Sequence, residues 1–409
     1  MTALVGREQP MGVLETLVDR TVTSHGGLAL VTGEAGIGKS TIVVEAVARA
    51  RDAGALAAVG TCWDRDGAPD HWPWVQVIRS VASTADADAW SEARRSAGGE
   101  VDALLGTGAG PVGPSGPTDR FALHDAVTTL LATLARDRPL VVVLEDLHWA
   151  DGPSLDLLSF ASRHAWYERL LLIGTYRDVE VETADDPRAG VLGHLAGRAT
   201  TLTLTGLDVD GVADVTAAAT GSAPPVEVAS ALHRRTGGNP FFVEQAARLW
   251  HTTGDVAAVP PGVQDVVDRR LSTLPGPVRS ALETVALLGR RVPRRVVEAA
   301  LAGGVGGSDS GSAGSDPRPG GRPGGAPAAG LPSTAGPIDG LPSTGGPVDA
   351  LLGPAVRARL VSVDDDEVRF VHDLIRQALI DGLDPTDAAD RHARLLDLLA
   401  APDLAGLVR

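Results

Sequence analysis

The sequence predicts an α/β fold: a parallel sheet with helices on both faces, followed by a small helical domain and a winged-helix-like domain. In the first half of the chain, apolar runs of strand length alternate with helical stretches and lack the in-strand alternation of a half-solvated sheet. Near residue 206 the strand signal ends and helical spacing takes over. Near residue 365 two short strand-like runs surround an acidic turn.

The predicted strands are continuous apolar runs. They cover Gly27–Thr32, Leu56–Val59, Leu140–Leu144, Leu170–Tyr176 and Thr201–Leu204. After the first strand and the segment GEAGIGKST, a helical stretch continues to about Arg51. Helical spacing recurs at Val75–Val81, Arg120–Arg136 and Ser154–Ala165. We expect loops around Trp63, Trp72 and Trp74, and over the Gly/Pro-rich residues 97–118. Because right-handed crossovers bring the carboxyl ends of parallel strands to one edge, a ligand is expected at that edge.

The chain divides into four predicted regions. Residues 1–206 form the sheet domain, residues 207–275 the helical domain, residues 276–383 the winged-helix-like domain, and residues 384–409 the start of a helical region. Helices are expected at Asp208–Ala219, Val226–Thr236, Phe241–Trp250 and Leu374–Leu383, with three more over residues 262–301. Residues 303–350 contain almost no large apolar side chains and include the tandem repeat LPSTAGPIDG and LPSTGGPVDA. This insert cannot offset its ordering entropy by burial, so we expect it to be disordered.

Composition restricts the class of protein. The 409 residues carry a formal charge of -16, which disfavours nonspecific contact with DNA phosphates or anionic lipid. Cys62 is the one cysteine, so no intrachain disulfide can form. The N-terminus lacks the pattern of a signal peptide, and no apolar run approaches the ~18 residues of a membrane span. We therefore expect a cytoplasmic protein with no membrane partner.

A phosphate-binding loop follows the first predicted strand. The segment GEAGIGKS fits the pattern G-x-x-x-x-G-K-[ST], whose backbone N–H groups point at phosphate oxygens while the next helix adds its positive N-terminal dipole. The predicted nucleotide contacts are Gly33, Glu34, Ala35, Gly36, Ile37, Gly38, Lys39, Ser40 and Thr41. Lys39, the chain's only lysine, would reach the β- and γ-phosphates, and Ser40 would hold Mg²⁺. The predicted ligands are therefore ATP or ADP with Mg²⁺.

Two acids end the third predicted strand, Leu140–Leu144. Glu145 and Asp146 are expected at the same sheet edge as the phosphate loop, where one acid holds the Mg²⁺ shell and the other polarises the attacking water. We assign Glu145 to the metal and Asp146 to the water, although the two roles could be exchanged. Arg177 follows the next strand and is expected near the γ-phosphate, with a surface arginine as the alternative. The predicted catalytic residues are thus Lys39, Glu145, Asp146 and Arg177.

Several motifs in order resemble the STAND class of signalling P-loop ATPases. More narrowly, the chain resembles the ATPase module, often labelled Orc1-like AAA, of large LuxR-type bacterial regulators. The markers are LVGRE, GEAGIGKS, the tryptophan-rich loop, LEDLHWAD, GTYRD, TGGNPFF and FVHDLIRQAL, and they cover about residues 4–300 and 350–395.

The resemblance implies further nucleotide contacts. Val5, Gly6 and Arg7 would lie against the adenine, and Pro240 of the Gly-Asn-Pro motif would pack on the base from the other side. His372 would touch the β-phosphate in a closed ADP form, with a histidine packed at a strand–helix junction as the alternative. The Gly-Asn-Pro motif also contains the chain's only asparagine. In the motif HWAD we expect a coupling or packing histidine, followed by an aspartate that starts a helix.

The resemblance also implies a function. We expect a slowly hydrolysing ATP switch that self-associates in its ATP state and responds to an unidentified inducer or protein partner. LuxR-type relatives continue to a DNA-binding helix-turn-helix, so this chain is expected to be a regulator core without direct DNA binding. The alternatives are an AAA+ ATPase acting on DNA, disfavoured by the net charge of -16, and an interaction module that binds ATP without hydrolysing it. A DNA-binding winged helix is disfavoured because its wing, DDDE, would repel phosphate.

Overall fold

The computed structural model describes residues 5–63, 69–106, 117–177, 187–302, 347–358, 360–364 and 366–400. The chain divides into two compact units. The first holds Met1–Arg269 together with Arg357–Leu360 and Val371–Ala378, and the second holds Arg270–Val356, Val361–Phe370 and Leu379–Arg409. The finer division into four regions stays a prediction.

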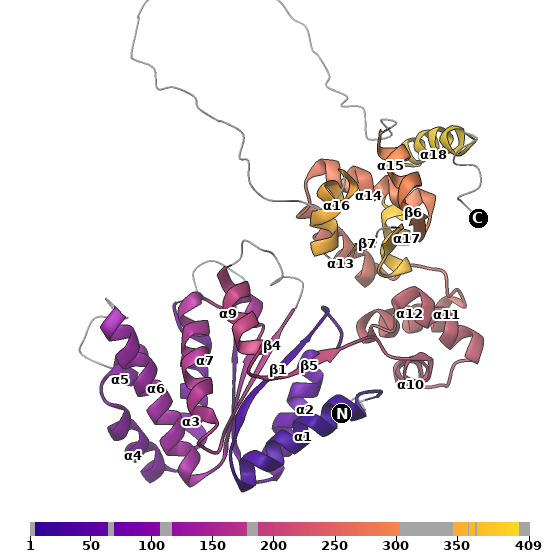
Figure 1. Ribbon diagram of the computed structural model, residues 1–409. Coiled ribbons are helices and arrows are strands. Elements are labelled where there is room, and N and C mark those ends of the chain that lie inside the picture. The colour runs from indigo at the N-terminus through magenta and orange to yellow at the C-terminus, as the bar shows by residue number, and fades with distance from the viewer. Residues whose placement is uncertain are drawn as a thin grey trace, which may run out of the picture. The chain divides into compact units, whose positions relative to one another are not determined.

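The first unit contains a five-stranded parallel sheet (Figure 1). Its strands are β1 (Gly27–Gly33), β2 (Leu56–Thr61), β3 (Leu140–Glu145), β4 (Leu170–Tyr176) and β5 (Thr200–Leu204). Their order across the sheet is β2-β3-β4-β1-β5. All five predicted strands are confirmed. Because β4 lies between β1 and β3, the strand that precedes Arg177 separates the phosphate-loop strand from the acidic strand.

Helices cover both faces of this sheet, as predicted. On one face, α1 (Glu8–Thr23) and α2 (Lys39–Asp52) pack on Ala29 and Val31 of β1. On the other face, α3 (Trp72–Thr84), α6 (Pro117–Asp137) and α7 (Gly152–Ala165) pack on Leu28 and Leu30 (Figure 1). Alternate residues of β1 therefore enter two different cores, which explains why the run Leu28–Val31 is apolar without alternation.

Two loop predictions are wrong. Trp72 and Trp74 lie in α3, where the Trp74 ring is fully buried and its Nε1 donates to the backbone oxygen of Ser154 at 3.1 Å. The region 97–118 includes the short helix α5 (Glu100–Leu104) and the first residues of α6, and it follows α4 (Ala87–Ala97). Val101 of α5 is fully buried in the core, which gives this Gly/Pro-rich stretch an anchor. Residues 107–116 of the predicted loop lie outside the described residues.

A helical segment follows β5, as expected. Its helices are α10 (Val209–Thr220), α11 (Val226–Thr236) and α12 (Pro240–Thr253). Two further helices, η1 (Leu147–Trp149) and α9 (Pro187–Ala196), come before β5 in the chain. Asp208 and Asn239 are the N-cap residues of α10 and α12, and each accepts a backbone N–H with its side chain. These caps satisfy donors that the first turn of a helix leaves free.

The remaining elements combine helices with a small antiparallel sheet. The helices are α13 (Pro261–Ser272), α14 (Gly276–Leu288), α15 (Arg294–Ala302), α16 (Pro347–Arg357), α17 (Asp373–Asp381) and α18 (Pro385–Leu399). The strands β6 (Arg291–Pro293), β7 (Val361–Val363) and β8 (Glu367–Phe370) pair in the order β6-β8-β7. The predicted three helices over residues 262–301 and the predicted pair of short strands are confirmed. The winged-helix assignment stays a prediction.

The prediction that residues 303–350 are disordered is wrong for the last four residues of this insert. Residues 347–350 belong to α16, whose buried Val348, Leu352 and Ala355 recur at helical spacing and so give this stretch apolar surface to bury. Residues 303–346 lie outside the described residues. Among the helices that are described, none is both long and apolar enough to cross a membrane.

Candidate nucleotide-binding site

The phosphate loop joins β1 to α2 at the carboxyl end of the sheet. Gly38 is the N-cap residue of α2 and has φ 102°, a left-handed conformation that favours glycine. Ile37 is only 2% exposed and packs in the core that α1 and α2 form with the sheet. This buried side chain fixes the loop to the domain while Ser40 and Thr41 remain exposed in the first turn of α2.

Lys39 lies over the loop and is 7% exposed. Its Nζ donates to the backbone oxygens of Gly33 and Glu34 at 2.9 and 2.8 Å. The ammonium is therefore held above the curled backbone, with its charge next to the place where the motif requires phosphate oxygens.

Arg7 fixes the loop from the N-terminal side. Its guanidinium donates to the backbone oxygens of Ile37 at 2.8 Å and Thr205 at 2.7 Å. Burial lowers the pKa of Arg7 from its ordinary value, although the nearby carboxylate of Glu8 acts in the opposite direction. The guanidinium thus binds two backbone carbonyls, one on the loop and one just after β5.

Gly6, the residue before Arg7, has φ 62°, and a Cβ there would lie 2.9 Å from Leu207 Cδ2. Val5 is half-buried, and the expected contact of Val5, Gly6 and Arg7 with the adenine stays a prediction.

The two predicted acids lie at the end of β3. Glu145 ends the strand, and its Oε1 is buried without a hydrogen-bond partner among the described residues. Asp146 has φ 58°, which is unusual for a residue other than glycine, and its N–H donates to Thr175 Oγ1 of β4 at 3.0 Å. A non-glycine residue in this conformation costs about 1–3 kcal/mol, and strain of this kind is concentrated at functional sites.

His148 connects the acids to the basic residues. It is 3% exposed, and its Nε2 lies 3.9 Å from Asp146 Oδ1. Burial, followed by the positive charges of Arg177, Lys39 and Arg188, lowers its pKa to about 3. The imidazole is therefore neutral at pH 7. These charge effects show that Lys39 and Arg177 both act on the same side chain, as expected for residues from neighbouring strands of one sheet edge.

Arg177 follows β4 and stacks on an aromatic ring. Its Cζ lies 5.1 Å from the ring centroid of Trp149. Arg188 donates to the backbone oxygen of His148 at 2.6 Å.

The aspartate expected to start a helix, Asp151, is the N-cap residue of α7 and accepts from Ser154 N at 2.7 Å. The motif HWAD therefore folds as predicted, with a packed histidine followed by a cap.

Three consecutive loop residues are bonded to distant segments of the first unit. His372 Nε2 lies 3.1 Å from Glu34 Oε2, and the Asn239 side chain donates to the backbone oxygen of Ala35 at 3.1 Å. Phe241 N donates to the oxygen of Gly36 at 3.4 Å. Pro240 begins α12 between two of these contacts, and its packing on the base stays a prediction. The hydrogen bond from Asn239 to the loop was not predicted from the sequence, where the one signal for it was that the chain contains no other asparagine.

The donor set at this edge fits Mg²⁺. A hard divalent cation takes oxygen ligands and is commonly held by one or two carboxylates together with substrate phosphates. The unpartnered Glu145 oxygen, the neighbouring Asp146 carboxylate and the exposed Ser40 hydroxyl provide such oxygens.

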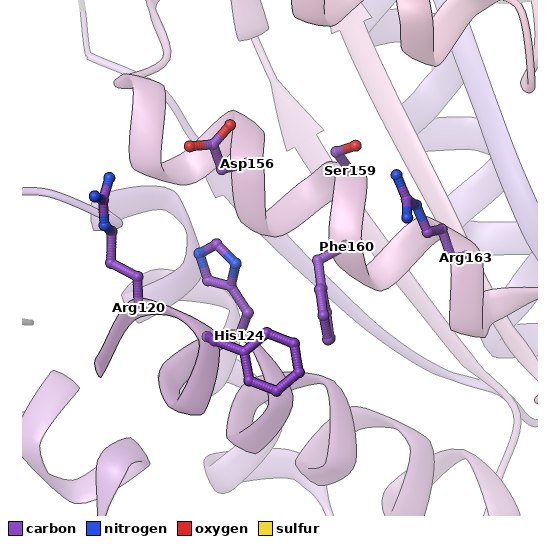
Figure 2. A pocket seen from close by; sticks show the side chains of 7 residues that line it. Arg120, His124, Asp156, Ser159, Phe160 and Arg163 are labelled. Carbon is purple, nitrogen blue, oxygen red and sulfur yellow. The ribbon is translucent and has the colours of Figure 1, made fainter. Parts of the chain in front are cut away.

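A separate hollow of about 350 Å³ lies between α6 and α7. Figure 2 shows Arg120 and Arg163 at its two ends, with His124 and Phe160 between them and Asp156 above. No residue predicted for the nucleotide site lines this hollow within the described part of the chain. Burial, with the charge of His71 as a smaller cause, lowers the pKa of His124 from its ordinary value.

The fold and the loop are those of a P-loop NTPase-like domain, and one family model matches it. Residues 3–173 match the family model of the AAA ATPase domain. This part of the chain therefore resembles ATPase domains of AAA type. No protein of curated function matches the chain significantly.

Three solved structures match most of this chain at low identity, with TM-scores below 0.5. A Walker-type ATPase of Pyrococcus abyssi has 13% identity and a TM-score of 0.49, over 92% of this chain and 96% of that one. A STAND protein with a tetratricopeptide repeat sensor from Pyrococcus horikoshii has 13% identity and a TM-score of 0.39, over 99% of this chain and 47% of that one. Cdc6p from Pyrobaculum aerophilum has 12% identity and a TM-score of 0.35, over 93% and 95% of the two chains.

Proposed function

We propose that this chain is a nucleotide-dependent signalling switch of the STAND type, which binds ATP with Mg²⁺ at the phosphate loop and hydrolyses it slowly. The observation that supports it is the set of bonds from His372, Asn239 and Phe241 to three consecutive residues of the loop. A loop that is bonded to segments more than 200 residues away in sequence can transmit the state of its ligand to them.

The switch works through differential affinity. A ligand shifts a conformational equilibrium only by as much as it prefers one form over the other. ADP would favour the form in which these distant segments are bonded to the loop. ATP, together with an unidentified inducer or protein partner, would favour a released form that self-associates. In the same proposal the chain is the cytoplasmic core of a LuxR-type regulator and does not itself bind DNA or membrane.

The residues at the sheet edge have distinct roles in hydrolysis. Lys39 would hold the β- and γ-phosphates, and Arg177 would distinguish a triphosphate from a diphosphate. Ser40, Glu145 and Asp146 would hold Mg²⁺, which when bound neutralises phosphate charge. The acid that does not hold the metal would orient the attacking water. The strained backbone of Asp146 and the buried oxygen of Glu145 support these assignments.

Sedimentation velocity tests the switch. The protein is compared in Mg²⁺ with ADP and with a nonhydrolysable ATP analogue, and Lys39→Ala serves as the control that should not respond to either. We expect a larger species with the analogue than with ADP. Identical size and shape in the two states would exclude the switch, even if the protein binds both nucleotides.

A further inference from the structure

The N-terminus of α12 meets the phosphate loop through one buried amide. Asn239 is 1% exposed, and its side chain makes two hydrogen bonds. Its Oδ1 accepts from Phe241 N at 3.2 Å, and its Nδ2 donates to Ala35 O at 3.1 Å. The acceptor role is fixed by the N–H of the helix, so the amide nitrogen must face the loop. One side chain therefore caps a helix and binds the phosphate loop at the same time.

The backbone of the loop is adapted to this contact. Gly36 occupies a position that the phosphate-loop pattern leaves free, yet it has φ 76°. A Cβ at Gly36 would lie 2.7 Å from Phe241 Cβ and 3.2 Å from Asn239 Oδ1. A real side chain would thus force the helix away from the loop. Phe241 N also approaches Gly36 O at 3.4 Å, which adds a backbone contact at the same place.

We propose that Asn239 is a positioning residue that holds the phosphate loop in its nucleotide-binding shape by docking the N-terminus of α12 on it. Affinity for ADP and docking of α12 are then two readouts of one equilibrium, and each strengthens the other. This inference rests on the proposed function, because it names the residue through which the helical segment acts on the nucleotide site.

The two roles of Asn239 can be separated by substitution. Asn239→Ser and Asn239→Asp keep a side-chain oxygen that can cap α12. The carboxylate of the aspartate variant has no hydrogen to donate to Ala35 O, and the serine side chain is one atom shorter than the amide that makes this bond. Asn239→Ala removes both the cap and the loop bond. Asp208→Ala is the matched control, because Asp208 caps α10 in the same helical segment and its side chain accepts from Gly211 N at 2.9 Å.

The first measurement needs no nucleotide. Amide hydrogen exchange is followed in peptides that cover residues 33–42 and 237–246 of the free full-length protein. We expect faster exchange at both places in Asn239→Ser and Asn239→Asp than in the wild type, and wild-type exchange in the loop of Asp208→Ala. Loop exchange at the wild-type rate in both asparagine variants would overturn the proposal.

The second measurement is the affinity for ADP with Mg²⁺ by calorimetry. We expect Asn239→Ser and Asn239→Asp to bind about tenfold more weakly, the order expected when one buried acceptor is left without its donor. Asp208→Ala should bind like the wild type. Unchanged affinity in the asparagine variants would overturn the proposal, whereas a wild type that does not bind nucleotide at all would overturn the proposed function and leave the exchange measurement to decide the role of Asn239.

Discussion

The imidazole Nε2 of His372 lies 3.1 Å from the Glu34 carboxylate, within the phosphate loop, although the two residues are 338 positions apart in sequence. His372 is 5% exposed and its ring packs edge-on against Phe242 at 5.2 Å. A Cβ on Gly237 would come within 2.8 Å of its Nδ1. The histidine is therefore fixed on α12 and the turn before it, and it reaches the loop through Glu34. The packed histidine, one of the two interpretations from the sequence, is what the structure shows, and a contact of His372 with the β-phosphate stays a prediction.

The contact predicts coupling between Glu34 and His372. Glu34→Gln and His372→Ala should each speed amide exchange in residues 371–378 and lower the free energy of unfolding. The double variant should be little less stable than either single variant, with a coupling energy on the order of 1 kcal/mol. Hydrogen exchange of that segment and urea unfolding provide the double-mutant cycle. His251→Ala, at an exposed histidine of α12, is the control. Fully additive effects of the two substitutions would show that the contact contributes nothing.

The acids at the end of β3 predict a separation of binding from turnover. Glu145→Gln and Asp146→Asn should bind ATP as the wild type does within a few fold, because the loop and Lys39 remain. The variant that loses the group orienting water should hydrolyse ATP about 100-fold more slowly. Steady-state turnover and calorimetric affinity, measured side by side, check this. A wild type that binds ATP but turns over no faster than both variants would favour the non-hydrolysing interaction module.

His148 predicts a loss of stability in acid. Its pKa is about 3 in the folded protein against an ordinary value of 6.5, so the unfolded chain binds the proton first as the pH falls. Stability should therefore be greatest above pH 6.5 and decline towards pH 3, by up to about 1.4 kcal/mol per pH unit for this group. Burial lowers the pKa of His71 and His124 as well, and these act in the same direction.

Urea unfolding of the wild type and His148→Gln at pH 7 and pH 5 checks this. The variant should lose less stability between the two values. If both proteins lost the same amount, His148 would not be the buried neutral group described above.

Cys62 provides a direct probe of the sheet edge. It is 3% exposed next to the acids, and its N–H donates to Glu145 O at 3.0 Å. Burial, together with the charges of Asp151 and Asp146, raises the pKa of its thiol to about 12. A maleimide at pH 7.5 should therefore react with the native protein at least about 100-fold more slowly than with the protein in urea, because both the thiolate and its access are suppressed. Native labelling at the unfolded rate would contradict the buried position.

The sheet and the phosphate loop could be predicted because their signals are local. The runs Leu28–Val31, Leu140–Leu144 and Leu170–Ile173 are continuously apolar, and the glycines, lysine and serine of the loop have fixed spacing. The start of α3 at Trp72 and the helix α5 were missed because burial of Trp74 and Val101 outweighs weak local signals. The bonds from Asn239 and His372 to the loop could not be derived by spacing. They join residues 204 and 338 positions apart, and only folding brings these together.

Equilibrium binding of ADP with Mg²⁺ to the wild type and to Lys39→Ala shows whether the nucleotide binds at this phosphate loop. Circular dichroism and a thermal melt first establish that the variant is folded. The wild type should show one binding site by calorimetry, and Lys39→Ala should show no measurable binding, because the one lysine that faces the loop carbonyls of Gly33 and Glu34 is gone. Equal affinity in the folded variant would contradict the assignment of the nucleotide to this loop.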